Sequence, residues 1–407
     1  MNRRWILLAL IFTGILISYV DRGNLSIAAP ALMREFALSP ASTGTLLSAF
    51  FWTYAAFQLP AGLLVDRCGV RWTYALAFSV WSLASAATAL SSLWEHILLL
   101  RIVLGMAEAV APLASLSVIR RYFTGADQGL PVSVYIAGQT IGPACGALLG
   151  STLLARFGWR VMFAVTGLGA LLWAPVWLYF APNHKLRRTS VERSQQHKKV
   201  SWPSILKSRA FWAMSICVFF FSYYWYFILT WMPAYLTIER RFPMIRMGYI
   251  LSMPLFAMAV LNVMAGWFAD RLISRGKELF LIRIWFSAGG LLGAALIFLL
   301  KVLPAAGIVL PVLMLSICSF GVANSNLWAL SQHVAPASMV GRVMGYLNTV
   351  SQLGGATAPL ITGWSLGTQR NFGVAIVIVS ISPVIACVLL LVAGPRGLQR
   401  LKEKLAT

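Results

Sequence analysis

Four ionisable side chains, setting Tyr and Cys aside, lie deep inside long apolar stretches of the sequence: Asp21, Arg22, Arg101 and Glu108. A charge at the centre of a bilayer costs roughly 2.5 to 3.5 kcal/mol on insertion scales, so such residues are expected to pair, to face water and to carry function. The rigid fork of an arginine matches a carboxylate and stays protonated at physiological pH. A buried carboxylate without a nearby cation can load and release a proton near neutral pH. Together these residues indicate binding of an anion and a proton.

The depths of these four residues suggest how they pair. Asp21 lies roughly 10 Å from the end of its span, and Arg101 enters the fourth span to about the same depth, at 1.5 Å per residue. We therefore expect an ion pair between Asp21 and Arg101, which leaves Arg22 for an anionic ligand. Glu108 lies roughly 20 Å into the fourth span with no obvious cation nearby. The alternatives are an Arg22 that only pairs with Asp21 and a Glu108 that stays protonated.

The elements that hold these residues are expected to be transmembrane helices. Of the 407 residues, 59% are hydrophobic and 11% charged, against roughly a quarter charged in soluble domains, so most of the surface must face lipid. A span needs about 20 apolar residues and must be helical to satisfy its backbone. Twelve candidates lie near 5–28, 44–64, 72–92, 95–119, 130–155, 159–181, 210–237, 247–269, 281–300, 308–332, 338–365 and 372–394.

The distribution of Lys and Arg predicts the orientation and the domains. Most basic residues fall in the gaps on the side of the N-terminus, which the positive-inside rule places in the cytoplasm, together with the C-terminus. The expected parts are a six-helix bundle at 1–181, a cytoplasmic linker at 182–209, a second six-helix bundle at 210–394 and a basic cytoplasmic tail at 395–407. The first span has no small-residue cleavage site after it and is expected to remain in the protein.

Several functions are disfavoured by the same composition. The formal charge of +22 lies in short gaps between apolar stretches rather than on a polar domain, so we expect no nucleic-acid partner. The five cysteines are scattered without metal-ligand spacing, and we expect neither a metal nor another cofactor. No pattern resembles a hydrolase or transferase site, so an enzyme is not expected.

One motif occurs in both halves of the chain. Gly62-x-x-x-Asp66-Arg67 closes the second span, and Gly266-x-x-x-Asp270-Arg271 closes the eighth. A repeat at equivalent positions of two six-span units is typical of parallel-repeat transporters that rock about a midplane site. We expect gating roles for Asp66, Arg67, Arg71, Asp270 and Arg271, whose charges can hold neighbouring helix ends together.

The loop sequence Gly62-Leu-Leu-Val-Asp66-Arg67-Cys-Gly69-Val-Arg71 resembles the signature of the major facilitator superfamily, and the resemblance covers essentially the whole chain. Three further motifs resemble its anion:cation symporter family, and within it the proton-coupled galactonate, glucarate and hexuronate transporters. These motifs are Tyr19-Val-Asp21-Arg22-Gly-Asn24-Leu-Ser, Arg101-x-x-x-Gly105-x-x-Glu108-Ala-x-x-Pro112 and Trp225-Tyr-Phe-Ile-Leu-Thr-Trp231-Met-Pro233-x-Tyr235-Leu.

The resemblance implies a role for each matching residue. Arg22 would receive the substrate carboxylate, while Asp21 and Glu108, with Arg101 as partner, would couple transport to protons. Polar and aromatic residues near the midplane would contact the hydroxyls of a sugar acid, or else anchor and join helices. These are Tyr19, Tyr54, Gln139, Trp328 and Asn348.

The sequence therefore predicts an all-α membrane protein with 12 transmembrane helices in two pseudo-symmetric six-helix bundles. We expect a proton-coupled symporter that imports a small organic anion, with a sugar acid favoured, as a monomer in the lipid bilayer of a bacterial-type inner membrane. The alternatives are an organic-anion or organophosphate antiporter, a drug exporter and a transporter-like solute sensor. The seventh span lacks the second arginine that organophosphate antiporters place there.

Overall fold

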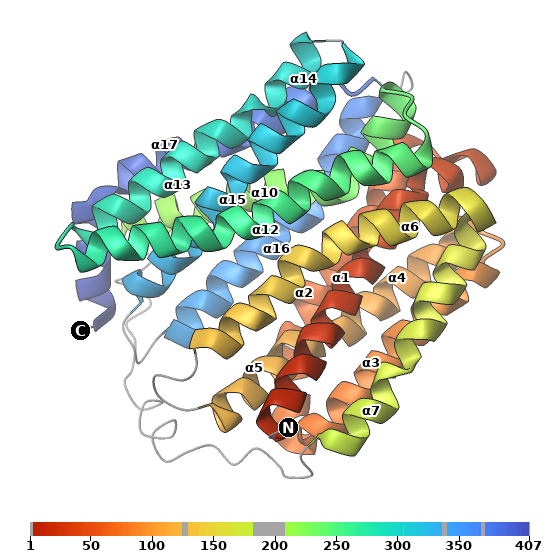
Figure 1. Ribbon diagram of the computed structural model, residues 1–407, viewed down its shortest axis with the longest axis horizontal. Helices are drawn as coiled ribbons and strands as arrows, with labels where there is room; N and C mark the ends of the chain where they lie inside the picture. The colour runs from red at the N-terminus through yellow and green to blue at the C-terminus, as the bar shows by residue number, and fades with distance from the viewer. Residues whose placement is uncertain are drawn as a thin grey trace. The chain divides into compact units, whose positions relative to one another are not determined.

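The computed structural model describes residues 3–123, 129–181, 208–303, 305–335, 340–367 and 371–406. Helices make up nearly all of these residues, and no strand occurs among them (Figure 1), so the predicted all-α fold class is confirmed. The predicted linker at 182–209 lies outside the described residues except for its last two positions, and it stays a prediction.

The first half of the chain contains seven α-helices in the described residues and one short 3₁₀ helix. They are α1 (Arg3–Glu35), α2 (Pro40–Cys68), α3 (Val70–Ala87), η1 (Thr88–Leu90), α4 (Trp94–Glu108), α5 (Val110–Tyr122), α6 (Gly129–Leu171) and α7 (Trp173–Phe180). Ser39 caps α2 by accepting a hydrogen bond from the Ser42 amide, and Pro40 occupies the first turn, where a missing N–H costs nothing.

The second half is built in the same way from long helices with short interruptions. They are α10 (Arg209–Thr230), α11 (Met232–Ala234), η3 (Tyr235–Glu239), α12 (Met244–Ser274), α13 (Leu279–Ala295), η4 (Leu296–Phe298), α14 (Leu299–Val302), η5 (Ala306–Ile308), α15 (Val309–Val334), α16 (Val340–Leu366) and α17 (Gly373–Ala406).

All twelve predicted spans fall on helices. Ten helical stretches of the described residues are long and apolar enough to cross a membrane. One of them, 130–180, contains the fifth and sixth predicted spans, which meet at a kink at Gly158. Helix α16 covers the described part of the eleventh predicted span, residues 340–365. Large apolar side chains such as Leu59 and Val263 are 75% and 70% exposed, as expected of surfaces that face lipid.

Contacts divide the chain into two compact units. Unit 1 comprises Met1–Arg187, Leu229–Ser252 and Pro359–Asn371, and unit 2 comprises Arg188–Ile228, Met253–Ala358 and Phe372–Thr407. Within unit 1, α1 lies along α6, α2 packs on α4, and α3 packs on α4 and α6 (Figure 1). Within unit 2, α13 packs on α15 and α17.

The contact between α1 and α6 depends on a stripe of small residues on α6. At Gly142, an added Cβ would come within 2.6 Å of the Tyr19 Cβ and 3.0 Å of the Leu16 carbonyl oxygen. Another helix, α1, therefore approaches α6 closely along this stripe. Because Tyr19 lies directly against Gly142, this packing also fixes the position of a predicted site residue.

Candidate functional site

Glu108 is the last residue of α4, at an interruption between α4 and α5. Pro112 has no amide hydrogen to donate to the carbonyl of Glu108, four residues earlier, so the regular helix cannot continue there. The Glu108 side chain is fully buried. The sequence thus places a carboxylate at a distorted point inside a membrane helix.

The centre of the candidate site is an ion pair between Arg22 on α1 and Glu108. The Arg22 Nε atom donates to the Glu108 Oε2 atom over 2.7 Å, and their side chains are 9% and 0% exposed. The Ser18 hydroxyl, one turn before Arg22 on α1, donates to the same oxygen over 2.9 Å. Ser18 and Arg22, one turn apart on α1, therefore both donate to the same carboxylate oxygen of Glu108.

Three aromatic rings surround the Arg22 guanidinium. Its central carbon lies 4.5 Å from the ring centre of Tyr19, 4.9 Å from that of Phe50 and 4.7 Å from that of Tyr54. The negative faces of aromatic rings stabilise a cation at such distances. We call Tyr19, Phe50 and Tyr54 the aromatic cage. Sequence reasoning identified Tyr19 and Tyr54 but missed Phe50, because an apolar residue in a span gives no signal of its own.

Asp21 faces a different group of partners. Its Oδ1 atom accepts hydrogen bonds from the Ser85 hydroxyl at 3.3 Å and the Asn24 amide at 3.4 Å, whereas its buried Oδ2 atom has no hydrogen-bond partner among the described residues. The Nε and Nη2 atoms of Arg101 are also buried without one. Arg101 is near enough to interact electrostatically with Asp21 and with Glu108.

The predicted pairing is therefore wrong. Among the described residues no Asp21–Arg101 ion pair occurs within 4.0 Å, and Glu108, expected to lack a cation, is bound by Arg22. The prediction compared the depths of Cα atoms, but helical side chains lean toward the N-terminus of their own helix. Because α1 and α4 run in opposite directions, Arg22 reaches back toward the level of Ser18 and Glu108, and similar Cα depths of Asp21 and Arg101 do not bring their side chains within ion-pair distance.

The remaining predicted binding residues lie on three helices. Gln139 on α6 is half-buried and donates to the Tyr135 hydroxyl over 3.0 Å. Trp328 on α15 and Asn348 on α16 are half-buried in unit 2. Their participation in one site with Arg22 stays a prediction.

The repeated Asp-Arg motifs lie at helix ends. Asp66 and Arg67 are exposed in the last turn of α2, and the Arg71 carbonyl accepts a hydrogen bond from the Trp177 indole over 3.1 Å. At the end of α12, the Arg271 guanidinium lies 5.3 Å from the Trp267 ring centre. The gating roles of these residues stay predictions.

Asp270 has a partner that sequence reasoning missed. Arg283 on α13 is 3% exposed and donates to the Asp270 carboxylate and, over 2.8 Å, to the Asn326 side-chain oxygen. Arg283 lies near the beginning of the predicted span 281–300, where a basic residue is expected to belong to the loop charges rather than to a buried ion pair. Arg283 follows Asp270 by thirteen residues across a short helical hairpin, and this spacing is the feature of the sequence that could have indicated their pairing.

A helical bundle with lipid-facing apolar surfaces and a charge cluster buried among its helices is typical of membrane transporters. The sequence profile of the Major Facilitator Superfamily matches residues 11–359. The chain therefore belongs to this superfamily, and it is a multi-pass membrane protein.

Curated relatives agree with this assignment. The chain is 28% identical to a D-galactonate transporter of Escherichia coli over 405 residues, which cover 94% of this chain and 93% of the relative. It is 28% identical to a probable galactarate/D-glucarate transporter of Bacillus subtilis, covering 96% and 92%. A chloroplastic ascorbate transporter of Arabidopsis thaliana is 27% identical, covering 89% and 70%. The predicted resemblance to sugar-acid transporters is thus confirmed.

A solved structure shows the same fold. It is a bacterial homologue of the human lysosomal transporter Spinster, in an inward-facing and unoccupied conformation. The similarity has a TM-score of 0.77 at 16% identity and covers 100% of this chain and 98% of the other.

Proposed function

We propose that this chain is a proton-coupled symporter that imports a small organic anion, with a sugar acid as the favoured substrate class. The proposal is supported by the galactonate and galactarate/D-glucarate transporters among its relatives and by the contacts of Arg22. By the same likeness, we place it in a bacterial-type inner membrane with both termini in the cytoplasm.

The observation that carries the proposal is the contact between Arg22 and Glu108. A carboxylate of the protein already occupies the Nε atom of the arginine that is expected to receive a substrate carboxylate. Protonation of Glu108 removes its negative charge and weakens this pair, so a substrate carboxylate can replace it. The proton and the anion therefore bind together, which is the requirement for symport.

Release follows by the reverse exchange. When Glu108 loses its proton on the alkaline side of the membrane, its carboxylate again competes for Arg22 and displaces the substrate. The aromatic cage keeps the guanidinium in place during both steps, because its three rings lie 4.5, 4.9 and 4.7 Å from the central carbon of Arg22. Alternating access between the two steps gives net transport.

Asp21 supplies a second proton site in this scheme. Within the described part of the chain its Oδ2 atom is buried without a hydrogen-bond partner, and Arg101 acts on it through space. Its protonation changes the field at the adjacent Arg22. Two protons with one monovalent anion would make uptake electrogenic.

Neutral polar groups predicted for the site support the favoured substrate class. The phenols of Tyr19 and Tyr54 and the amide of Gln139 can each donate and accept hydrogen bonds, which suits a chain of hydroxyls. Asn348 and Trp328 are proposed as further substrate contacts. A single exchangeable arginine contact suits one carboxylate better than a phosphate dianion.

The test is uptake by vesicles that contain only the purified protein. Labelled D-galactonate, D-glucarate and glucuronate are offered with the vesicle lumen alkaline, with and without an uncoupler. We expect at least one of them to accumulate, and the accumulation to disappear with the uncoupler. Uptake that is unaffected by the uncoupler but requires a preloaded anion would instead identify an exchanger.

A further inference from the structure

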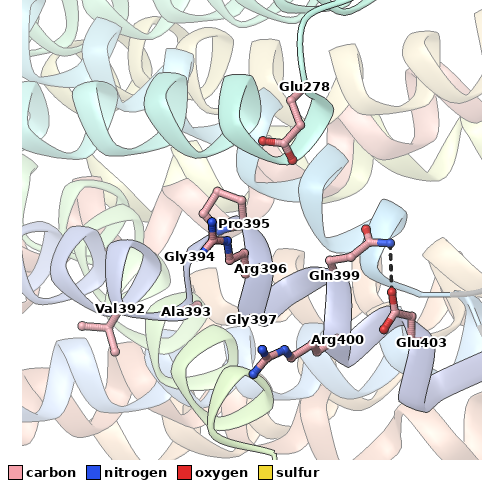
Figure 2. Close-up of a pocket in the computed structure, with 10 residues that line it drawn as sticks. All are labelled: Glu278, Val392, Ala393, Gly394, Pro395, Arg396, Gly397, Gln399, Arg400 and Glu403. Atoms are coloured by element: carbon pink, nitrogen blue, oxygen red, sulfur yellow. Dashed lines mark hydrogen bonds between the residues drawn. The ribbon is translucent and has the colours of Figure 1, made fainter.

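A recess lies where α17 bends, within unit 2 and far along the chain from Arg22. It has a volume of about 1010 Å³, comparable to the upper range of small-molecule sites. Its walls come from α17 on both sides of the bend and from Glu278 at the start of α13 (Figure 2). Neither the charge cluster of α1 and α4 nor the proposed transport cycle involves it.

The bend is fixed by two adjacent residues. Gly394 has φ 58° and ψ 165°, a conformation that side-chain-bearing residues avoid, and Pro395 cannot donate the next helical hydrogen bond. Before the bend, Val388 and Val392 are 52% and 74% exposed on the last apolar span, so this surface faces acyl chains. The bend thus marks the end of the lipid-facing surface.

After the bend, α17 is amphipathic and basic. Leu398, Leu401 and Leu405 are buried against unit 2, whereas Arg396 and Arg400, one helical turn apart, are exposed and line the recess. Among the described residues neither arginine forms an ion pair within 4.0 Å. The neighbouring Glu403 accepts a hydrogen bond from Gln399 instead (Figure 2).

We infer that this recess binds one anionic phospholipid, with the phosphodiester at Arg396 and Arg400 and an acyl chain along Val392. Two arginines one turn apart match the oxygens of a phosphate, and an exposed valine on the span side matches hydrocarbon. No water-soluble anion uses both features. An amphiphile with its charge at this boundary uses both.

Glu278 restricts the kind of lipid headgroup that the recess can bind. Its carboxylate extends from the start of α13 toward the bend (Figure 2). It can accept hydrogen bonds from headgroup hydroxyls but repels a second negative charge. The recess is therefore suited to a singly charged headgroup that carries hydroxyls, such as phosphatidylglycerol, in preference to the more highly charged phosphatidic acid.

The test is native mass spectrometry of the full chain in detergent, titrated with phosphatidylglycerol, phosphatidylcholine or phosphatidic acid. The wild type is expected to retain one phosphatidylglycerol molecule more tightly than either other lipid. In R396Q/R400Q the dissociation constant should rise about tenfold or more. The matched control R275Q/K277Q removes the same charge from the adjacent loop, outside the recess, and should change it less than about twofold.

Two further arms test the acyl chain and the headgroup separately. Glycerophosphoglycerol, the headgroup without acyl chains, should fail to displace the lipid at equal concentration. E278Q should improve the binding of phosphatidic acid specifically. Equal retention of phosphatidylglycerol in R396Q/R400Q, an equal loss in the control, or full displacement by the bare headgroup would each overturn the inference. Unchanged thermal unfolding of the variants confirms that they are folded.

Discussion

Arg22 and Glu108 lie on antiparallel helices of one unit, and a 2.7 Å hydrogen bond joins the Nε atom of the first to the Oε2 atom of the second. Ser18 holds Glu108 through a hydrogen bond, and the aromatic cage holds Arg22. The Glu108 carboxylate occupies the position on Arg22 that a substrate carboxylate needs, so the two carboxylates compete for Arg22. Each consequence of that competition can be measured.

The E108Q variant should separate substrate binding from the proton. Wild-type affinity for a transported sugar acid should fall as pH rises, because the deprotonated Glu108 competes for Arg22. The amide that replaces this carboxylate carries no charge at any pH, so the affinity of the variant should be nearly constant. Isothermal titration across pH 5 to 8 measures this, a range of about three units around neutrality.

Transport by the same variant provides the second half of that test. Counterflow of labelled substrate should persist in E108Q, whereas accumulation driven by a pH gradient should be lost. E239Q, which removes an exposed carboxylate, is the control and should behave as wild type. Gradient-driven accumulation in E108Q at the wild-type level would rule out the proposed competition.

Replacing Arg22 should remove binding itself. R22A is expected to weaken affinity for the sugar acid about 100-fold, since a charge-assisted bidentate contact is lost. R22K keeps the charge but not the planar fork, so an intermediate loss is expected. Ligand-induced thermal shifts of the purified variants report both effects. R156Q, at an exposed position of α6, should bind normally, and an R22A variant that binds as well as R156Q would contradict the assignment.

The contact of Gly142 with Tyr19 predicts a large effect from one methyl group. G142A places a Cβ within 2.6 Å of the Tyr19 Cβ, and overpacking of this kind costs about 1 to 3 kcal/mol. G169A is the matched control on the same helix, because nothing lies within 4 Å of its added Cβ. Thermal unfolding in detergent should show a lower midpoint for G142A alone. Equal midpoints for the two variants would mean that α1 and α6 are less closely packed.

Removal of Arg283 should destabilise unit 2. R283M leaves the Asn326 oxygen and the Asp270 carboxylate without their donor, and an unsatisfied buried acceptor costs about 1 to 3 kcal/mol. Asp270 is largely exposed and can be solvated, so most of the loss should come from Asn326. The double variant R283M/N326L should therefore recover part of the stability in thermal unfolding. A double variant less stable than R283M would contradict this division.

The sequence predicts the helices of this protein better than their contacts. Hydropathy places all twelve spans, because lipid leaves the backbone no alternative to helix. The rarity of charge in the membrane identifies Asp21, Arg22, Arg101 and Glu108. Their pairing depends on the direction in which long side chains lean, which spacing along one helix does not reveal. Phe50 was missed for another reason, since its role comes from the cation beside it.

The two halves of the chain differ in the loop that follows the repeated motif. Helix α3 begins four residues after Asp66, whereas α13 begins nine residues after Asp270. After this longer loop, the buried Arg283 attaches Asp270 to α13 and also donates to Asn326 on α15. The duplicated loops have therefore diverged in length, and substitutions at equivalent positions of the two motifs should not produce mirror-image effects.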